Sequence, residues 1–201
     1  MNTVSVDDLA VYTATWVAGL IATDDTLKAE DIALSDIRDI NDNMIQKSRA
    51  FDCTDCRVGC ASCCTLRPDA YQGEASRIVT LLKTFPSNIY EETVDRLAKN
   101  AKLEHLPISI YLKRKVRCAF LDIDTNACRI YEERPILCRD YSSTDVKKCK
   151  RAVGKPSYNI YPSAKAFNIQ MHIVVALQRA LLHLGVTPTV TPLHTAVLEL
   201  L

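Results

Sequence analysis

Hydrophobic residues recur at intervals of three and four along most of the chain, a spacing that lets one face of a helix pack on a core. The sequence therefore predicts a mostly α-helical fold. The expected helices cover roughly residues 5–22, 34–45, 71–84 and 87–104, a long stretch after Pro162, and 193–201.

Polar residues at the start of two of these helices are typical of N-terminal caps. Ser5 and Asp8, three residues apart, resemble a capping box for the first helix. Ser87 is the candidate N-cap of the helix over 87–104. Glu91 and Glu92 are expected in the first turn of that helix, where negative charge is favoured by the helix dipole.

The helical pattern is interrupted in two places. Between residues 51 and 68, cysteines and Gly59 replace the hydrophobic periodicity, so we expect a loop whose shape depends on what its thiols bind. Between residues 116 and 131, short β-branched runs flank a polar turn. This pattern predicts a small β-hairpin with Cys118 and Cys128 on opposite arms.

The length of the chain bounds its domain organisation. A chain of 201 residues is long enough for one compact domain with extensions. We expect an N-terminal helical hairpin at 1–52, a cysteine-rich metal-binding core at 53–150, and C-terminal helices that pack on this core at 151–201. The terminal helices are also the candidate contact surface for a protein partner.

The charge balance gives no general attraction to an anionic partner. The chain has 25 Lys and Arg against 24 Asp and Glu, a formal net charge of +1. We therefore expect neither nucleic acid nor an anionic membrane surface as a partner. The short basic runs at 113–115 and 147–148 lack interleaved aromatic residues and are interpreted as solvated faces.

No segment has the pattern of a signal peptide or a membrane span. The apolar stretch over 11–21 contains threonines and follows no basic run. The stretch over 173–186 is too short and is interrupted by Gln178, Arg179 and His183. We therefore expect a cytoplasmic protein, in a reducing environment that disfavours structural disulfides.

Nine cysteines are the main chemical feature of the sequence. Five of them lie within the twelve residues from Cys53 to Cys64, with two-residue spacings that bring thiolates to one centre. Three later cysteines, with nine residues between each, are expected to close the site after folding. The predicted metal ligands are Cys56, Cys60, Cys63, Cys64, Cys118, Cys128 and Cys138.

The ligand pattern leaves two cofactors open. An all-cysteine zinc site and a four-cysteine [4Fe-4S] cluster use the same type and number of ligands. Zinc sites usually pair two C-x2-C knuckles, and only the first cysteine group has such spacing, so the pattern favours iron-sulfur slightly. Buried structural thiols, or a redox pair at Cys53 and Cys56, are the alternatives to ligation.

Residues around the cysteines support a site rich in thiolates. Pro135 suits the first turn of a helix, which would put Cys138 near a helix N-terminus where a thiolate is favoured. Several arginines could offset the charge of bound thiolates or could be ordinary surface residues: Arg57, Arg67, Arg117, Arg129, Arg134 and Arg139.

Other catalytic motifs are missing from the sequence. The five glycines form no phosphate-binding loop, and there is no H-E-x-x-H or G-x-S-x-G pattern. The four histidines stand singly and are interpreted as surface or satisfied core residues. His105, ahead of the Cys118 segment, is the one that we keep as a candidate additional ligand.

The cysteine motifs resemble those of a known family, the YkgJ-type proteins described as zinc- or iron-chelating CxxCxxCC domains. The run from Cys56 to Cys64 is similar to the opening C-x3-C-x2-C-C of that family. Cys118-Ala-Phe-Leu and the run from Cys128 to Arg139 are similar to its later signatures. The resemblance covers about residues 56–140 and implies a chelated zinc or iron.

Three functions follow as hypotheses. The leading one is a metal- or cluster-binding protein with a structural, electron-transfer or metal-handling role. Proteins described as flagellin lysine methylases carry a similar cysteine cluster, so the resemblance also implies methyl transfer to a protein lysine as an enzymatic alternative. The third is a zinc-braced interaction module. Cys149 and Cys53 lie outside the resemblance, and Cys149 is expected to be a free surface thiol.

Overall fold

The computed structural model describes residues 59–139, 141, 143, 145–155, 171, 174–175, 178–179, 181–182 and 187–201. The chain divides into two compact units, one formed by residues 1–53 and 163–189 and the other by residues 54–162 and 190–201. The second unit contains most of the described residues and all of the described cysteines. Its fold positions the candidate site.

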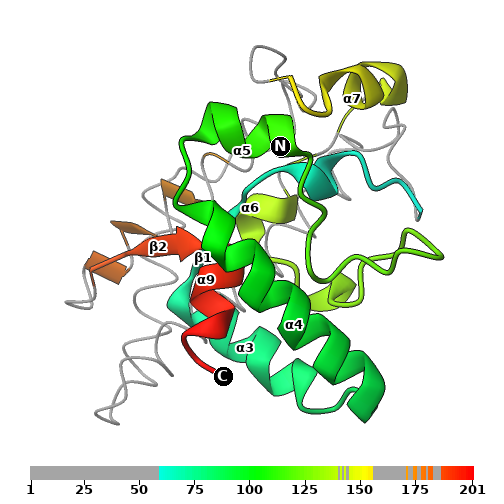
Figure 1. Ribbon diagram of the computed structural model, residues 1–201. Helices are drawn as coiled ribbons and strands as arrows, with labels where there is room; N and C mark the ends of the chain where they lie inside the picture. The colour runs from blue at the N-terminus through cyan, green and yellow to red at the C-terminus, as the bar shows by residue number, and fades with distance from the viewer. Residues whose placement is uncertain are drawn as a thin grey trace, which may run out of the picture. The chain divides into compact units, whose positions relative to one another are not determined.

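Three helices form the frame of this unit. They are α3 (Gln72–Leu82), α4 (Ser87–Glu104) and α9 (Leu193–Leu198). Figure 1 shows α9, which comes from the C-terminal end of the chain, lying between α3 and α4. The apolar faces of the three helices meet in a buried core that includes Ile78, Leu82, Leu97, Leu193 and Val197.

A two-stranded antiparallel sheet closes one end of the frame. Strand β1 (Asp69–Tyr71) pairs with β2 (Val190–Pro192), with Ala70 opposite Thr191. The pairing joins segments more than a hundred residues apart in sequence. The Leu193 N–H also donates to the Pro68 carbonyl at 3.0 Å, so the sheet fixes the start of α9 beside the end of the cysteine loop.

The other described helices of this unit are short, and three of them carry cysteines. They are η1 (Cys63–Thr65), α5 (Ile108–Arg114), η2 (Tyr131–Glu133), α6 (Ile136–Arg139) and α7 (Val146–Ala152). Among the described residues, no helix is long and apolar enough to cross a membrane.

The mostly helical fold with a small antiparallel β element is confirmed, and α3, α4 and α9 confirm three expected helices. The described residues between 171 and 182 are also helical, as expected after Pro162. The expected helices over 5–22 and 34–45, and the hairpin that they would form, lie outside the described residues. The predicted division at 1–52, 53–150 and 151–201 stays a prediction.

The start of α4 differs from expectation. Pro86 occupies the N-cap position, and Ser87 is the first helical residue and makes no capping hydrogen bond. Glu91 and Glu92 therefore fall beyond the first turn. Proline suits the start of a helix because the missing N–H would have no partner there.

The β-hairpin expected over residues 116–131 is reduced to one isolated bridge between Leu121 and Cys128. The Asp122 carboxylate accepts from the Asp124 and Thr125 N–H groups at 3.0 and 2.9 Å, so the chain reverses through a side-chain-capped turn. The only sheet in the described residues is the one between β1 and β2. The prediction of a turn here was right, but the prediction of paired strands was wrong.

Candidate metal centre

The first described cysteines lie in a tight loop that ends in η1. Gly59 has a φ of +84°, a left-handed conformation that favours glycine, where the chain enters the loop. The Cys64 N–H donates to the Ala61 carbonyl at 3.1 Å, and the Thr65 hydroxyl donates to the Ser62 carbonyl at 3.1 Å. These local bonds hold Cys63 and Cys64 side by side.

Helix α4 positions Cys118, the next cysteine along the chain. Arg96 on α4 donates to the carbonyls of Cys118 and Leu121 at 2.6 and 2.7 Å, and Asn100 donates to the Arg117 carbonyl at 2.8 Å. The Cys118 N–H in turn donates to the Cys64 carbonyl at 2.7 Å. The backbone of Cys118 is therefore bonded directly to that of Cys64, fifty-four residues earlier in the sequence.

Cys128 and Cys138 reach the same region through separate contacts. The bridge to Leu121 holds Cys128 beside the Cys118 segment, and the Arg129 N–H donates to the Phe120 carbonyl at 2.8 Å. Cys138 lies on the single turn α6. The Ile136 N–H donates to the carboxylate of Glu74 on α3 at 2.7 Å, which fixes the start of α6.

The two adjacent cysteines of η1 have opposite acidities. A hydrogen bond from the Cys64 thiol lowers the pKa of Cys63 to about 7. Burial opposes this shift, and the charge of Arg134 adds to it. The same bond raises the pKa of Cys64, and burial and the charges of Cys63, Cys118 and Cys128 add to this rise. Of this pair, Cys63 is the more acidic thiol, and Cys64 favours its protonated form.

Cys128 and Cys138 favour their protonated forms. Burial, then the charges of Cys118 and Cys63, raises the pKa of Cys128 to about 11. Burial and the same two neighbours, with Cys128, also raise the pKa of Cys138. The expectation that a helix N-terminus would favour a Cys138 thiolate is wrong, because α6 has only four residues and the Cys138 N–H already donates to Pro135.

Of the arginines that could offset thiolate charge, Arg134 is close enough to do so. Its charge lowers the pKa values of Cys63, Cys128 and Cys138, and its guanidinium lies 4.1 Å from the centre of the Tyr131 ring. Three others are engaged elsewhere: Arg67 with backbone carbonyls after α4, Arg129 with Glu92, and Arg139 with the carbonyls of Glu132 and Arg134. Arg117 is exposed, and Arg57 lies outside the described residues.

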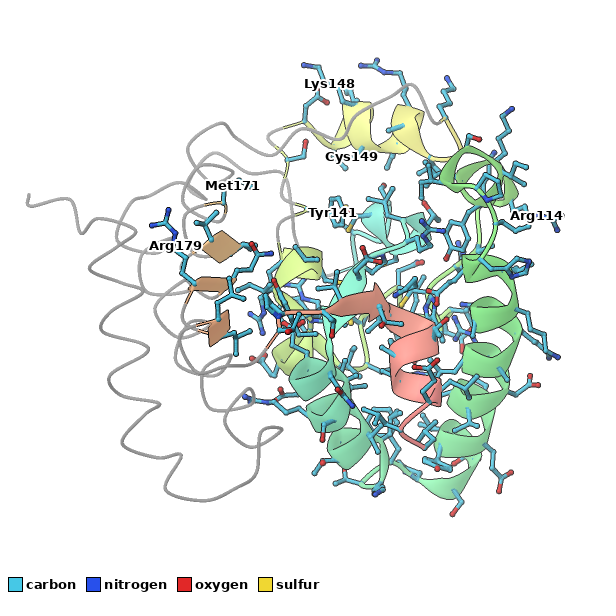
Figure 2. The ribbon with its side chains drawn as sticks, turned by 90° about the vertical axis from the view of Figure 1, so that its left-hand side faces the viewer. Arg114, Tyr141, Lys148, Cys149, Met171 and Arg179 are labelled. Carbon is cyan, nitrogen blue, oxygen red and sulfur yellow. The ribbon has the colours of Figure 1, made fainter. Side chains whose placement is uncertain are left out.

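Cys149 is a correction to the sequence analysis. It was expected to be a surface thiol, but it is only 6% exposed. Burial raises the pKa of Cys149, and the charges of Cys60 and Cys63 add to this rise. Figure 2 shows Cys149 on the side of α7 toward the body of the unit, whereas Lys148 extends away from it. Cys149 thus belongs to the thiol cluster in space.

The structure therefore brings together most of the predicted ligands. Cys63, Cys64, Cys118, Cys128 and Cys138 interact electrostatically, and Cys60 lies near Cys149. Cys56 and Cys53 lie outside the described residues. The seven described cysteines are free thiols. No three cysteine, histidine or carboxylate side chains among the described residues have an arrangement that could hold a metal ion as they stand.

A histidine and a glutamate beside Cys118 were missed by the sequence analysis. His194 on α9 is fully buried, and its Nδ1 lies 2.7 Å from the Glu104 carboxylate. Burial alone would lower the pKa of His194, but hydrogen bonds to Cys118 and Glu104 raise it to about 9. His105, the histidine kept as a candidate ligand, is instead exposed at the end of α4.

The contacts of His194 describe two states of its ring. The Ala119 N–H points to Nε2 at 3.2 Å, which requires an unprotonated Nε2. A raised pKa requires a proton on Nε2 that can face the Cys118 sulfur. Nε2 can therefore accept from the Ala119 amide when it is unprotonated, or face Cys118 as a donor when it is protonated.

Comparison with known proteins assigns the class. The chain belongs to the CxxCxxCC family, whose model matches residues 52–159 and whose description reads "Putative zinc- or iron-chelating domain". The match confirms the resemblance drawn from the motifs and extends it to Cys53 and Cys149. No curated protein and no solved structure matches the chain significantly.

Proposed function

We propose that this protein binds iron or zinc through its clustered cysteines, and that the bound metal joins segments that are far apart in sequence. The observation that carries the proposal is the approach of five free thiols from three separate segments, the loop at η1, the turn over 118–128, and α6. Apolar burial alone would not select this convergence, because thiols pack well anywhere in a core.

The chemistry of the surrounding residues fits a bound cation with thiolate ligands. Cys128 and Cys138 have raised pKa values, so they hold protons that a metal would displace on binding. Among the described residues, the Nε of Arg134 and the hydroxyl of Tyr111 are buried without a hydrogen-bond partner. The charge of Arg134 acts on Cys63, Cys128 and Cys138, and that of Cys118 acts on Tyr111. Thiolates or cluster sulfides would give these donors acceptors.

The thiols are not closed around one point in the protein as described. We therefore propose that metal binding completes the site by small movements of the η1 loop and of the 118–128 turn, which lack regular secondary structure. When bound, the metal or cluster supplies the coordination bonds, and iron would also supply electron transfer. Of the two cofactors, the spacing of the cysteines favours a [4Fe-4S] cluster over zinc.

The candidate ligands are the seven cysteines predicted from the sequence: Cys56, Cys60, Cys63, Cys64, Cys118, Cys128 and Cys138. A reducing compartment such as the cytoplasm suits this role, because the thiols must stay reduced to bind. Methyl transfer to a protein lysine and a zinc-braced interaction module stay alternative predictions.

The test is to purify the full chain without air or chelator and to measure iron, zinc and sulfide per chain. We expect at least one equivalent of iron or zinc, with a brown colour if a cluster is present. Cys118→Ser, Cys128→Ser and Cys138→Ser should each lower the bound metal sharply. Absence of both metals from the wild-type protein would overturn the proposal.

A matched control separates loss of a ligand from loss of stability. Val197→Ala removes buried apolar volume from α9, where the side chain is fully buried, and leaves every thiol in place. We expect this variant to melt at a lower temperature but to keep its full metal content. If Val197→Ala loses as much metal as Cys118→Ser, the cysteine effect reports only stability.

A further inference from the structure

The buried carboxylate at the end of α4 holds the start of α9. Glu104 is 2% exposed and accepts four hydrogen bonds from two consecutive residues. The His194 N–H and Nδ1 lie 3.3 and 2.7 Å from its Oε1, and the Thr195 N–H and hydroxyl lie 2.9 and 2.8 Å from its Oε2. Both oxygens are therefore fully engaged, and the imidazole has one fixed orientation.

The other end of the imidazole faces the cysteine cluster. With Nδ1 bonded to Glu104, Nε2 lies 3.2 Å from the Ala119 nitrogen, the amide directly after Cys118. The charge of Cys118 acts on the same ring, where it helps to raise the pKa of His194. The ring is also stacked on Phe120, at 6.1 Å between centroids. One side chain thus connects the C-terminal helix to a predicted ligand.

We propose that His194, oriented by Glu104, is an outer-sphere partner of the metal centre that accepts the Ala119 N–H and so holds the backbone of Cys118 and positions its sulfur. This inference rests on the proposed function, because it assigns Cys118 as a ligand. It makes the C-terminal segment, which carries no cysteine, a part of the metal site.

Physical chemistry favours this role over simple reinforcement of the fold. Burying a charged carboxylate and an imidazole costs free energy, and an apolar pair of similar size could join α4 to α9 at lower cost. Metal ligands, in contrast, are commonly oriented by hydrogen bonds from buried second residues, which also reduce the charge on the sulfur. The His194–Glu104 pair has the geometry that such an arrangement needs.

Two variants of His194 test the two ends of the ring separately. In His194→Asn, the side-chain amide can replace Nδ1 and bond to Glu104, but nothing reaches Cys118. In His194→Gln, the longer side chain can replace Nε2 and reach the Cys118–Ala119 segment, but the bond to Glu104 is lost. If His194 only stabilised the fold, His194→Gln, which loses the bond to Glu104, would have the larger defect of the two.

The experiment measures metal release and sulfur bonding in the full chain. The metal found in the wild-type protein is transferred to a chromophoric chelator and its dissociation rate is recorded. A second sample is loaded with Co²⁺, and its thiolate-to-metal charge-transfer absorption is measured. We expect His194→Asn to release metal about 10- to 100-fold faster than wild type, with a shifted absorption band. His194→Gln should have the smaller effect.

The outcomes separate this inference from the proposed function. If the wild-type chain binds neither its own metal nor Co²⁺, the proposed function fails. If the wild type binds metal and His194→Asn releases it at the wild-type rate with an unchanged spectrum, the proposed function stands and His194 has no role in the centre. The inference would also be overturned if His194→Gln released metal faster than His194→Asn and the release rates only paralleled the loss in melting temperature.

Discussion

The helical frame and the cysteine region of this protein are held together in different ways. In the frame, formed by α3, α4 and α9, apolar side chains such as Ile78, Leu82 and Leu97 are fully buried against one another. The cysteine region, residues 59–66 and 117–139, has only short helical turns and one isolated bridge. It adds Ala119, Phe120 and Ile130 to the same core, and its backbone is bonded to side chains that reach out from the frame, such as Arg96, Asn100 and Glu74.

This difference indicates that the frame can fold by apolar burial, whereas the cysteine region needs the frame and, in our proposal, the metal. Burial first, and then the charges of the neighbouring thiols, raises the pKa values of Cys128 and Cys138, so these thiols resist ionisation beside one another. A bound cation would reverse this repulsion. Perturbing each region separately tests whether the two are stabilised independently.

Removal of the metal should give the largest effect. A structural zinc site contributes about 10–16 kcal/mol of apparent binding energy in small peptides, comparable with the stability of a whole domain. Removal of the metal by a chelator should therefore reduce the protection of the Cys118 and Arg129 amides from hydrogen exchange. Amides inside α4, around Leu97, should stay protected. Equal loss of protection in both regions would show that the frame does not fold independently of the metal.

Truncation of the core should perturb the frame with less effect on the site. Leu97 is fully buried on α4, so Leu97→Ala should lower the free energy of unfolding by about 2–5 kcal/mol. Chemical denaturation measures this loss, and elemental analysis of the folded variant should still find the wild-type metal content. Loss of metal from protein that remains folded would contradict the separation of the two regions.

The link between the regions should depend on pH. Burial raises the pKa of Glu104, but hydrogen bonds from His194 and Thr195 and the charge of His194 outweigh burial, so the pKa is lowered below 4.5. The stabilisation from this carboxylate is therefore present above pH 4.5 and lost as the pH falls through the lowered pKa.

Glu104→Gln should then cost about 1.5–3 kcal/mol near neutral pH, the range for hydrogen bonds to charged groups. The difference from wild type should shrink as the pH is lowered below 4.5, and thermal melting at several pH values would measure it. A difference that stays constant down to pH 3 would mean that the ionised carboxylate is not what stabilises the start of α9.

The smallest expected effect is at Cys149. The buried position and the raised pKa predict that its thiol is alkylated much more slowly in the native protein than in urea. Cys149→Ser places a hydroxyl among thiols and apolar groups, and we expect it to cost about 1 kcal/mol. Mass spectrometry of the alkylated protein tests the first statement, and rapid native alkylation would restore the expectation of a surface thiol.

The sequence predicted the frame better than the cysteine region for a physical reason. Helices α3 and α4 follow from local spacing of apolar residues, which acts within a few turns of one segment. The turn over 118–128 was expected to pair as strands, but its backbone bonds instead to Arg96 and Cys64, which no local pattern shows. Cys149 was misassigned because its lysine neighbours indicated a surface. Its burial depends instead on which side of α7 it occupies.

The sequence by itself determined α3, α4 and α9, the cysteine inventory and the family, since each depends on residue types and short spacings. Only the tertiary structure decided that Cys149 lies with the other thiols and that His194 lies against Cys118. The His194 contacts to Glu104 and Ala119 span 90 and 75 residues. Local propensity carries no information over such separations, because these contacts form only when β1, β2 and the core have brought α9 onto α4.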